Sequence, residues 1–245
     1  MIDRRTLLGA LGASLLWPPG AAAAKPAPAY TPEQIKSPTR ISGVVRYGGK
    51  APRPKKVKFS GDCAYCRRFD LREEGLLTGA GGALRNVVVM LEKVRRGKPV
   101  VESPTLAELR CTFVPHVLSM TAGGKVRLLN QDPVLNTFHA IAFPSKRTLF
   151  NVGLPNKDQH VDRRIADPGV VQMRCDVHPW EEAYVVAVGH PYHCVTDARG
   201  AFALDQVPPG RYTLLLWHEK LGARRKPVQV GPGGHLKLEL VYPVK

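Results

Sequence analysis

The 245-residue chain contains no long apolar run and no extended helical pattern. Beyond its first residues, no stretch reaches the roughly 18 to 20 consecutive apolar residues that a membrane-spanning helix needs. No long segment repeats its apolar side chains with the 3.6-residue period of an amphipathic helix. We therefore expect neither a transmembrane segment in the mature protein nor a helical core.

Several motifs of cofactor chemistry are missing as well. "CAYCR" contains Cys63 and Cys66 but no His after the second Cys, so it does not support covalent haem attachment. The glycine-rich runs at 79–82 and 231–234 lack the strand–helix context of a phosphate-binding loop. Ser, His and Asp residues show no order typical of a nucleophilic hydrolase.

Acidic residues are scarce relative to basic ones. The 20 Asp and Glu residues against 36 Lys and Arg give a formal net charge of +16. A basic surface suits an acidic partner, such as a redox partner protein, or an anionic surface. A solvated surface without a specific partner is an equally good interpretation. Nucleic acid is not expected, because the chain has no recognisable binding motif and its N-terminus resembles an export signal.

The N-terminus predicts export to the periplasm or to the outside of the cell. Residues 1–24 combine a charged start, a short apolar run and an Ala-rich stretch that offers a cleavage site near Ala24. Arg4 and Arg5 favour a twin-arginine signal, with an ordinary secretory signal as the alternative. Residues 25–40 are rich in Pro and Ala and are typical of an extended linker.

Short apolar runs separated by turns fill the rest of the chain, which has 23 Gly and 22 Pro. Residues 84–94 form a continuous apolar run, typical of a strand that is buried on both faces. Residues 125–130 alternate apolar and polar side chains, as a half-buried strand does. A helical turn or two is expected at most, near 31–36 or 103–110. The pattern as a whole predicts an all-β fold of sandwich type.

The cysteine count is odd, which leaves at least one thiol unpaired within the chain. The five residues are Cys63, Cys66, Cys111, Cys175 and Cys194. Disulfides are permitted in an exported protein. If Cys175 serves a functional site, the other four can pair in three ways, of which Cys63 with Cys111 and Cys66 with Cys194 is one.

The stretch "RCDVHPWEEAYVV", residues 174–186, places Cys175 and His178 just before an apolar strand. Thiolate and imidazole are ligands that suit copper, and blue-copper sites combine one Cys with two His and a weak axial Met. The Cys, the second His and the axial ligand of such a site share one loop. The stretch therefore predicts two ligands of a copper site.

Residues 113–143, "FVPHVLSMTAGGKVRLLNQDPVLNTFHAIAF", and residues 173–188, "MRCDVHPWEEAYVVAV", resemble the cupredoxin family. Within that family they are most similar to the amicyanin and plastocyanin-like proteins of the methylamine-utilisation type. The shared features are a Pro-containing strand, a Gly turn, a strand ending in Asn130 and the final Cys-x-x-His-Pro-aromatic motif. The resemblance implies a β-sandwich that binds copper and carries single electrons.

Carried over residue by residue, the resemblance implies an altered ligand set. Cys175 matches the copper thiolate and His178 the second imidazole. Glu181 stands at the position of the axial Met, and Asn136 at the usual position of the first His ligand. His139 matches a second His that does not ligate. Two of the four ligands are therefore replaced.

His139 is an alternative ligand. Residues 136 and 139 point to opposite faces of a regular strand, but a loop or a different register would bring His139 to the metal. Glu181 is a hard oxygen ligand, which favours Cu(II) or zinc over a redox-balanced copper. We predict a metal site of Cys175, His178, His139 and Glu181 that holds copper, with zinc or no metal as the alternatives.

Residues 195–241 resemble the carboxypeptidase regulatory-like, transthyretin-like β module. The matching residues are Thr196, Asp197, Gly200, Phe202, Pro208, Pro209, Gly210 and Tyr212. Residues 41–59 resemble the opening of the same module. We therefore expect the two ends of the chain to pair in one sandwich, with the cupredoxin-like part inserted between them.

The expected organisation follows from these segments. It comprises an export signal at 1–24, a linker at 25–40, an N-terminal β segment at 41–100, a cupredoxin-like domain at 101–189 and a regulatory-like β module at 190–245. The first functional hypothesis is an exported copper protein that carries electrons and is not an enzyme. The alternative is a non-redox module that binds carbohydrate or protein and keeps a degenerate metal site. A third is zinc or Cu(II) binding through Glu181.

Overall fold

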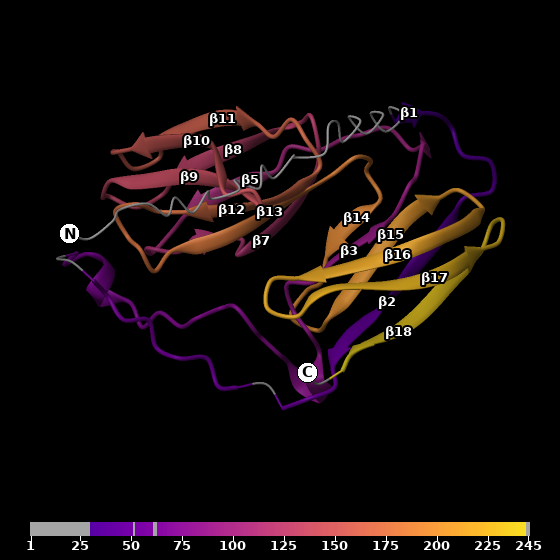
Figure 1. Cartoon of the computed structure of the whole chain (residues 1–245), viewed down its shortest axis with the longest axis horizontal. Coiled ribbons are helices and arrows are strands. Elements are labelled where there is room, and N and C mark those ends of the chain that lie inside the picture. The colour runs from indigo at the N-terminus through magenta and orange to yellow at the C-terminus, as the bar shows by residue number, and fades with distance from the viewer. Residues whose placement is uncertain (1–29, 51, 61–62, 244–245) are drawn as a thin grey trace, which may run out of the picture.

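The computed structural model describes residues 30–50, 52–60 and 63–243, and within them it is almost entirely β. Two β-sandwiches lie side by side (Figure 1). The all-β sandwich fold predicted from the sequence is confirmed. The expected export signal at 1–24 lies outside the described residues, as do residues 25–29 of the expected linker. No helix within the described residues is long and apolar enough to cross a membrane.

The first sandwich contains the strands that carry the predicted copper ligands. Its five-stranded sheet has the order β10-β9-β12-β13-β7, formed by β7 (Val117–Thr121), β9 (Asn136–Phe143), β10 (Arg147–Leu154), β12 (Gly169–Arg174) and β13 (Glu182–Val188). Its four-stranded sheet has the order β11-β8-β5-β6, formed by β5 (Thr105–Glu108), β6 (Phe113–Val114), β8 (Lys125–Asn130) and β11 (His160–Arg164). Strand β8 shows the predicted alternation of buried and exposed side chains.

Apolar side chains from both sheets fill this sandwich. Leu106, Leu128, Phe138 and Met173 are among its fully buried members. Burying a side chain of this size stabilises the fold by roughly 1.5 to 3 kcal/mol. Cys175 belongs to the same cluster, so the candidate metal loop lies at the edge of a packed core.

The second sandwich joins the two ends of the chain. One sheet has the order β14-β3-β16-β17, formed by β3 (Val88–Leu91), β14 (His193–Val195), β16 (Gly210–His218) and β17 (Gly222–Val230). The other has the order β15-β2-β18, formed by β2 (Thr39–Tyr47), β15 (Ala201–Val207) and β18 (His235–Tyr242). Strand β2 pairs antiparallel with β15 and parallel with β18, which is the pairing expected between the two ends. The division into domains itself stays a prediction.

Strand β3 is buried on both faces, as its apolar run predicted. Val89 and Leu91 face the core of the second sandwich. Val88 and Met90 face the other way and pack against Val186 of β13 and its neighbours in the first sandwich. This small apolar cluster joins the two sandwiches.

The remaining elements are short. Strands β1 (Thr31–Pro32) and β4 (Arg96–Gly97) form a two-stranded parallel pair. The 3-10 turns are η1 (Cys66–Arg68) and η2 (Ala80–Gly82). The helical turns expected near 31–36 and 103–110 are wrong, because Thr31–Pro32 pairs as β1 with β4 and Thr105–Glu108 pairs as β5 with β6 and β8.

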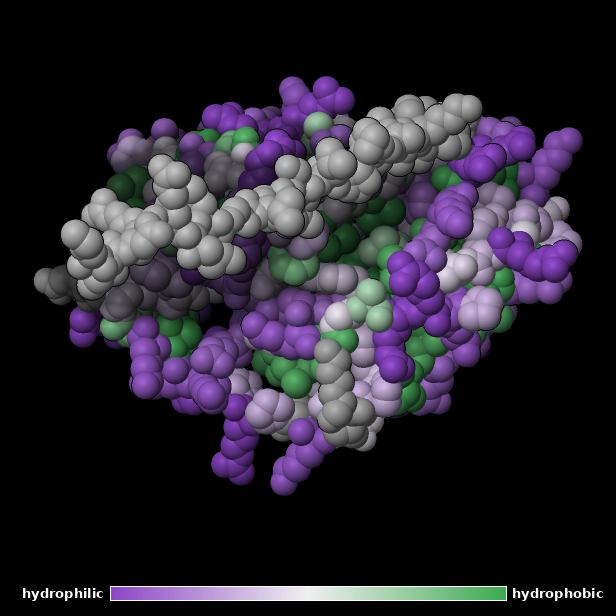
Figure 2. Space-filling view, in the orientation of Figure 1, coloured by the Kyte–Doolittle hydropathy of each residue, from purple (hydrophilic) through white to green (hydrophobic). Residues whose placement is uncertain are grey.

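A long segment between β2 and β3 leaves the second sandwich and runs along the first (Figure 1). It carries η1, whose Cys66 forms a disulfide with Cys111. The disulfide therefore fastens this segment beside the loop that contains Cys175 and His178. Hydrophilic side chains are spread over both sandwiches on the face shown in Figure 2 rather than gathered on one of them.

Candidate metal centre

The loop between β12 and β13 carries three of the predicted ligands. Cys175 directly follows β12, and Glu181 directly precedes β13. The backbone N–H of Cys175 donates to the carbonyl of Glu181 at 3.4 Å, and the N–H of Glu181 donates to the carbonyl of His178 at 2.9 Å. The loop is thus closed by its own backbone, because β12 and β13 are adjacent antiparallel strands.

His178 lies between the other two side chains of this loop, at the spacing of neighbouring donor atoms around a metal ion. Cys175 Sγ lies 3.6 Å from His178 Nδ1, and that nitrogen lies 3.2 Å from Glu181 Oε1. Zinc binds sulfur at about 2.3 Å and nitrogen or oxygen at about 2.0 to 2.2 Å, so neighbouring donor atoms in a tetrahedron lie roughly 3.3 to 3.7 Å apart. All three residues are buried. The groups of donor atoms that lie within 4.8 Å of one another include Glu108 with Cys175 and Glu181, and Cys66 with His178 and Glu181.

Glu108 is a fourth member of the cluster, which the sequence analysis missed. It ends strand β5 in the opposite sheet, where it pairs with Asn130 of β8. Its side chain is fully buried, and donor atoms of Glu108, Cys175 and Glu181 all lie within 4.8 Å of one another. Its only sequence signal is a carboxylate inside the short apolar run "TLAEL".

The two carboxylates are buried without adequate partners. Both oxygens of Glu108 and both oxygens of Glu181 accept no hydrogen bond from the described residues. The nearest charged contact of Glu181 is the 3.2 Å approach of His178 Nδ1. Burial, together with the neighbouring Glu181 and Cys175, holds the pKa of Glu108 well above its ordinary value. An uncompensated buried carboxylate is costly, so this cluster requires a proton or a cation.

His178 is the cationic partner available within the protein. Burial opposes its charged form, but the close contacts with the Cys175 sulfur and the Glu181 carboxylate outweigh burial and raise its pKa to about 10. In the metal-free protein His178 is therefore positively charged and partly balances the acidic side chains. One imidazolium faces two carboxyl groups and one thiol, which leaves room for further positive charge.

Asn136 lies on the inner face of β9, at the position where the resemblance placed a missing His ligand. It is fully buried, and its Nδ2 donates to Asn130 Oδ1 at 2.9 Å. Its own Oδ1 is buried and has no hydrogen-bond partner among the described residues. Asn136 therefore offers an oxygen where the resemblance implied an imidazole.

His139 lies on the opposite face of β9 and is not brought to the cluster. Its Nδ1 contacts Asp176 Oδ1 at 2.9 Å, and its Nε2 contacts Thr148 Oγ1 at 2.9 Å. The strand is regular from Asn136 onward, so the three-residue spacing turns His139 outward. The structure thus places the predicted fourth ligand away from Cys175, and Glu108 stands in the cluster instead.

Thr137 holds the Cys175 sulfur in place. Its backbone N–H donates to Cys175 Sγ at 3.4 Å, and its hydroxyl lies 3.6 Å from the same sulfur. That hydroxyl also accepts a hydrogen bond from the Asp176 N–H at 2.6 Å. Hydrogen bonds to a ligand sulfur orient it and tune its electron density, so Thr137 supports the site without binding a metal itself.

The cysteine pairing differs from the option given above. Cys66 pairs with Cys111, while Cys63, Cys175 and Cys194 are free. The pairing of Cys66 with Cys194 is wrong because Cys194 lies on β14 in the second sandwich, where it is a free, partly buried thiol. Cys66 Sγ instead lies 3.7 Å from His178 Nε2.

Trp180 closes the loop on the side of the disulfide. Its ring lies 5.1 Å from the ring of His178 and 5.0 Å from that of Phe59, measured between centroids. Its Nε1–H donates to the carbonyl of Cys111 at 3.3 Å. The imidazole thus lies between the buried side chains of Cys175 and Glu181, the disulfide and an aromatic side chain, and its Nδ1 faces Cys175 and Glu181.

The donor set does not fit a blue-copper centre. Such a centre needs two imidazoles and one thiolate in a plane, whereas this cluster offers one imidazole, one thiolate and two carboxylates. The same set does fit a divalent metal that accepts mixed donors, because zinc binds Cys, His and Glu side chains in proteins. The unpartnered oxygens of Glu108 and Glu181 are the observation that favours this fit.

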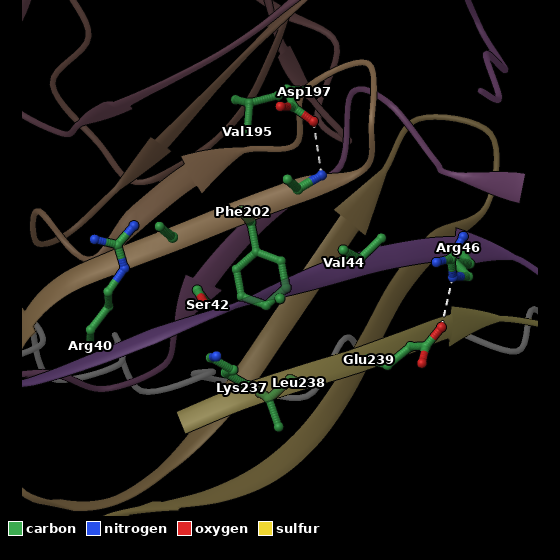
Figure 3. A pocket seen from close by; sticks show the side chains of 13 residues that line it. Arg40, Ser42, Val44, Arg46, Val195, Asp197, Phe202, Lys237, Leu238 and Glu239 are labelled. Carbon is green, nitrogen blue, oxygen red and sulfur yellow. Dashed lines mark hydrogen bonds and ion pairs between the residues drawn. The ribbon is translucent and has the colours of Figure 1, made fainter. Parts of the chain in front are cut away.

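A recess of about 820 Å³ lies elsewhere, on the face formed by β2, β15 and β18. Phe202 lies at its centre, with the pair Arg46 and Glu239 at one end (Figure 3). Arg46 Nε contacts Glu239 Oε1 at 2.7 Å, and Arg40 contacts Asp205 at 3.3 Å. Among the described residues its lining contains no Cys or His, so the metal-ligand chemistry lies in the first sandwich.

No protein-family model matches this chain, and no curated protein does. Among solved structures, a purple cupredoxin from Nitrosopumilus maritimus is 21% identical with a TM-score of 0.32, over 35% of this chain and 100% of that one. Amicyanin from Paracoccus versutus is 14% identical with a TM-score of 0.32, over 36% of this chain and 83% of that one. A copper-containing nitrite reductase from Thermus scotoductus SA-01 is 17% identical with a TM-score of 0.30, over 47% of this chain and 25% of that one. At these TM-scores the likeness carries no argument about the metal, which rests on the side chains alone.

Proposed function

We propose that this protein binds one divalent metal ion, for which zinc is the best fit, in the buried cluster of Cys175, His178, Glu181 and Glu108. The observation that carries the proposal is the pair of carboxylates, whose four oxygens are buried and accept no hydrogen bond from the described residues. A cation at this place would supply the missing partner to both. The protein is then a metal-binding protein rather than an enzyme.

The two sheets of the sandwich divide the ligands between them. Glu108 comes from the four-stranded sheet, and Cys175 and Glu181 flank strands of the five-stranded sheet. A metal ion held by all three would therefore cross-link the sheets. Because the unfolded chain does not bring these ligands together, metal binding is expected to stabilise the fold.

Substitution with Co(II) tests the ligand set directly. We expect one equivalent of Co(II) to give a thiolate-to-cobalt charge-transfer band and the intense visible bands of a four-coordinate site. Cys175→Ser should remove the charge-transfer band, whereas Cys194→Ser, which alters a thiol in the other sandwich, should leave it unchanged. Co(II) spectra typical of an octahedral ion with oxygen ligands alone would overturn the proposal.

Single-electron transfer by copper is the second candidate. It is supported by the position of Cys175 and His178 on one loop and by the Thr137 N–H that donates to the Cys175 sulfur. Two carboxylates would favour Cu(II) over Cu(I), which works against a carrier that must hold both states. Loading with Cu(II) decides between the two candidates, because an intense visible thiolate-to-copper band would support the electron carrier. The predicted export and an acidic redox partner belong to this second candidate.

A further inference from the structure

A third sulfur lies against the disulfide. Cys63 Sγ is 2.7 Å from Cys66 Sγ, although Cys66 is bonded to Cys111. The three sulfur atoms all lie within 4.8 Å of one another. Cys63 and Cys66 form the Cys-x-x-Cys motif that the sequence shows and that the proposed metal site does not use.

The three cysteines differ in their access to solvent. Cys66 and Cys111 are fully buried, whereas Cys63 is a free and partly exposed thiol. Of these three cysteines, Cys63 is therefore the one through which a reagent in solution can approach the disulfide.

Local structure holds Cys63 in position against Cys66. The backbone N–H of Cys66 donates to Cys63 Sγ at 3.3 Å. The N–H of Arg67 donates to the carbonyl of Cys63 at 3.2 Å, which closes the turn that leads into η1. The turn therefore holds the Cys63 sulfur directly beside the Cys66 sulfur.

Asp132 fixes both sides of the sulfur cluster. Its carboxylate accepts the backbone N–H groups of Arg110 and Cys111, each at 2.7 Å, and the hydroxyl of Tyr65 at 3.0 Å. Arg110 and Cys111 both have left-handed backbone, with φ of 56° and 57°, so the turn depends on this anchor. One buried carboxylate thus orders the turn of Cys111 and the Cys-x-x-Cys turn relative to each other.

We propose that Cys63, Cys66 and Cys111 form a thiol–disulfide exchange site that external dithiols reach through Cys63. The Cys63 thiolate attacks Cys66 Sγ, a Cys63–Cys66 bond forms and the Cys66–Cys111 bond breaks. The electron pair of the broken bond stays on Cys111 Sγ, which takes up the proton that Cys63 released. One disulfide and one thiol are present before and after, so the step needs neither oxidant nor reductant.

The exchange determines whether the disulfide is fully buried or includes the partly exposed Cys63. With Cys66 bonded to Cys111, the disulfide is buried and the thiol is partly exposed. With Cys66 bonded to Cys63, the disulfide includes the exposed sulfur and the thiol is buried. A dithiol such as dithiothreitol then reduces the accessible bond, becoming a cyclic disulfide while the protein gains two thiols. None of its three cysteines is among the four proposed ligands, although Cys66 Sγ lies 3.7 Å from Nε2 of the proposed ligand His178.

Peptide mapping after an acid quench tests the exchange. The protein is unfolded at low pH with N-ethylmaleimide and digested with trypsin, which yields peptides 59–67 and 111–125. The Cys66–Cys111 form gives these two peptides cross-linked, with one label on Cys63. The exchanged form gives peptide 59–67 with an internal disulfide and peptide 111–125 with a label on Cys111. We expect both forms, with proportions that equilibrate during incubation at mildly alkaline pH.

Two variants, each lacking one of the exchanging cysteines, test the proposed exchange further. Cys63→Ser retains the native disulfide and should give only the unlabelled cross-linked peptides, with reduction by dithiothreitol slowed at least tenfold. Cys111→Ser should form the Cys63–Cys66 disulfide after oxidation. The proposal is overturned if the wild type gives only the cross-linked form at every time and pH, if Cys63 and Cys66 of Cys111→Ser both remain free thiols after oxidation, or if Cys63→Ser is reduced as fast as the wild type.

Discussion

Glu108 and Glu181 stand far apart in the sequence, on opposite sheets of one sandwich, yet their carboxylates meet beside the Cys175 sulfur. Both side chains are closed to solvent, and no described residue donates a hydrogen bond to either. A protein that only needed to fold would be more stable with an apolar side chain at either position. The two buried carboxylates are therefore the feature that a bound cation would stabilise.

Glu108→Gln removes one carboxylate while keeping the shape of the side chain. We expect zinc affinity to fall at least tenfold, because a charged oxygen ligand is lost. We also expect the metal-free protein to unfold at a higher denaturant concentration, because the amide is neutral in both folded and unfolded chains and avoids the cost of burying a carboxyl whose pKa is raised. Competition with a chromophoric chelator and urea unfolding measure the two effects. Glu73→Gln, at an exposed carboxylate, is the matched control, and equal zinc affinity in the two variants would exclude Glu108 as a ligand.

Replacing Asn136 and Glu181 with the ligands of a blue-copper centre should convert the metal site into one of that type. The double variant Asn136→His, Glu181→Met supplies the second imidazole and the axial thioether that a blue-copper centre uses. We expect this variant, loaded with Cu(II), to show an intense visible charge-transfer band that the wild type lacks. Absorption spectroscopy of both proteins under the same loading measures this. An equally intense band in the wild type would show that the existing donors already form such a centre.

Gly43 tests the pairing of the two chain ends. A Cβ at this position would lie 2.0 Å from the carbonyl oxygen of Leu238 on the neighbouring strand β18. Gly43→Ala should therefore separate β2 from β18 and lower the free energy of unfolding by about 2 kcal/mol or more. Gly231→Ala, where a Cβ meets nothing within 4 Å, is the control and should change stability by less than about 1 kcal/mol. Equal stability of the two variants in urea would contradict the strand pairing.

His218 gives the second sandwich a pH dependence. Its burial lowers its pKa to about 4, with Glu219 opposing the shift and Lys220 reinforcing it. The folded protein therefore keeps the ring neutral, while the unfolded chain takes up a proton near its ordinary pKa of about 6.5. The associated stability is fully present above pH 6.5 and is lost as the pH falls toward 4, by on the order of 3 kcal/mol.

The variant His218→Gln isolates this contribution. The free energy of unfolding is measured for both proteins between pH 4 and pH 7, and their difference should shrink as the pH falls through that range. His190, whose pKa burial also lowers to about 4, titrates in both proteins and cancels in the comparison. A difference that stays constant with pH would show that His218 does not titrate in this window.

The sequence predicted those features that depend on local pattern. Alternation identified strand β8, the continuous apolar run identified β3, and the Cys-x-x-His motif located the loop of Cys175 and His178. The regular spacing of Asn136 and His139 also pointed to opposite faces, and the structure has them so. Each of these rests on neighbours within a few residues.

The features that the sequence did not predict depend on contacts across the fold. Glu108 enters the cluster only because the opposite sheet packs over the Cys175 loop. The pairing of Cys66 with Cys111 depends on the long segment after β2 running along the first sandwich. Neither contact leaves a periodic or short-range signal, and a Glu beside apolar residues is as typical of a strand end as of a ligand.

X-ray absorption at the zinc K-edge of the zinc-loaded protein tests the central claim most directly. We predict one equivalent of zinc with a single sulfur at about 2.3 Å and three nitrogen or oxygen ligands at about 2.0 to 2.2 Å. The sulfur should disappear in Cys175→Ser, and one nitrogen or oxygen ligand in Glu108→Ala. Two or three sulfur ligands would instead place the metal at Cys63, Cys66 and Cys111, and no uptake of zinc would contradict the site altogether.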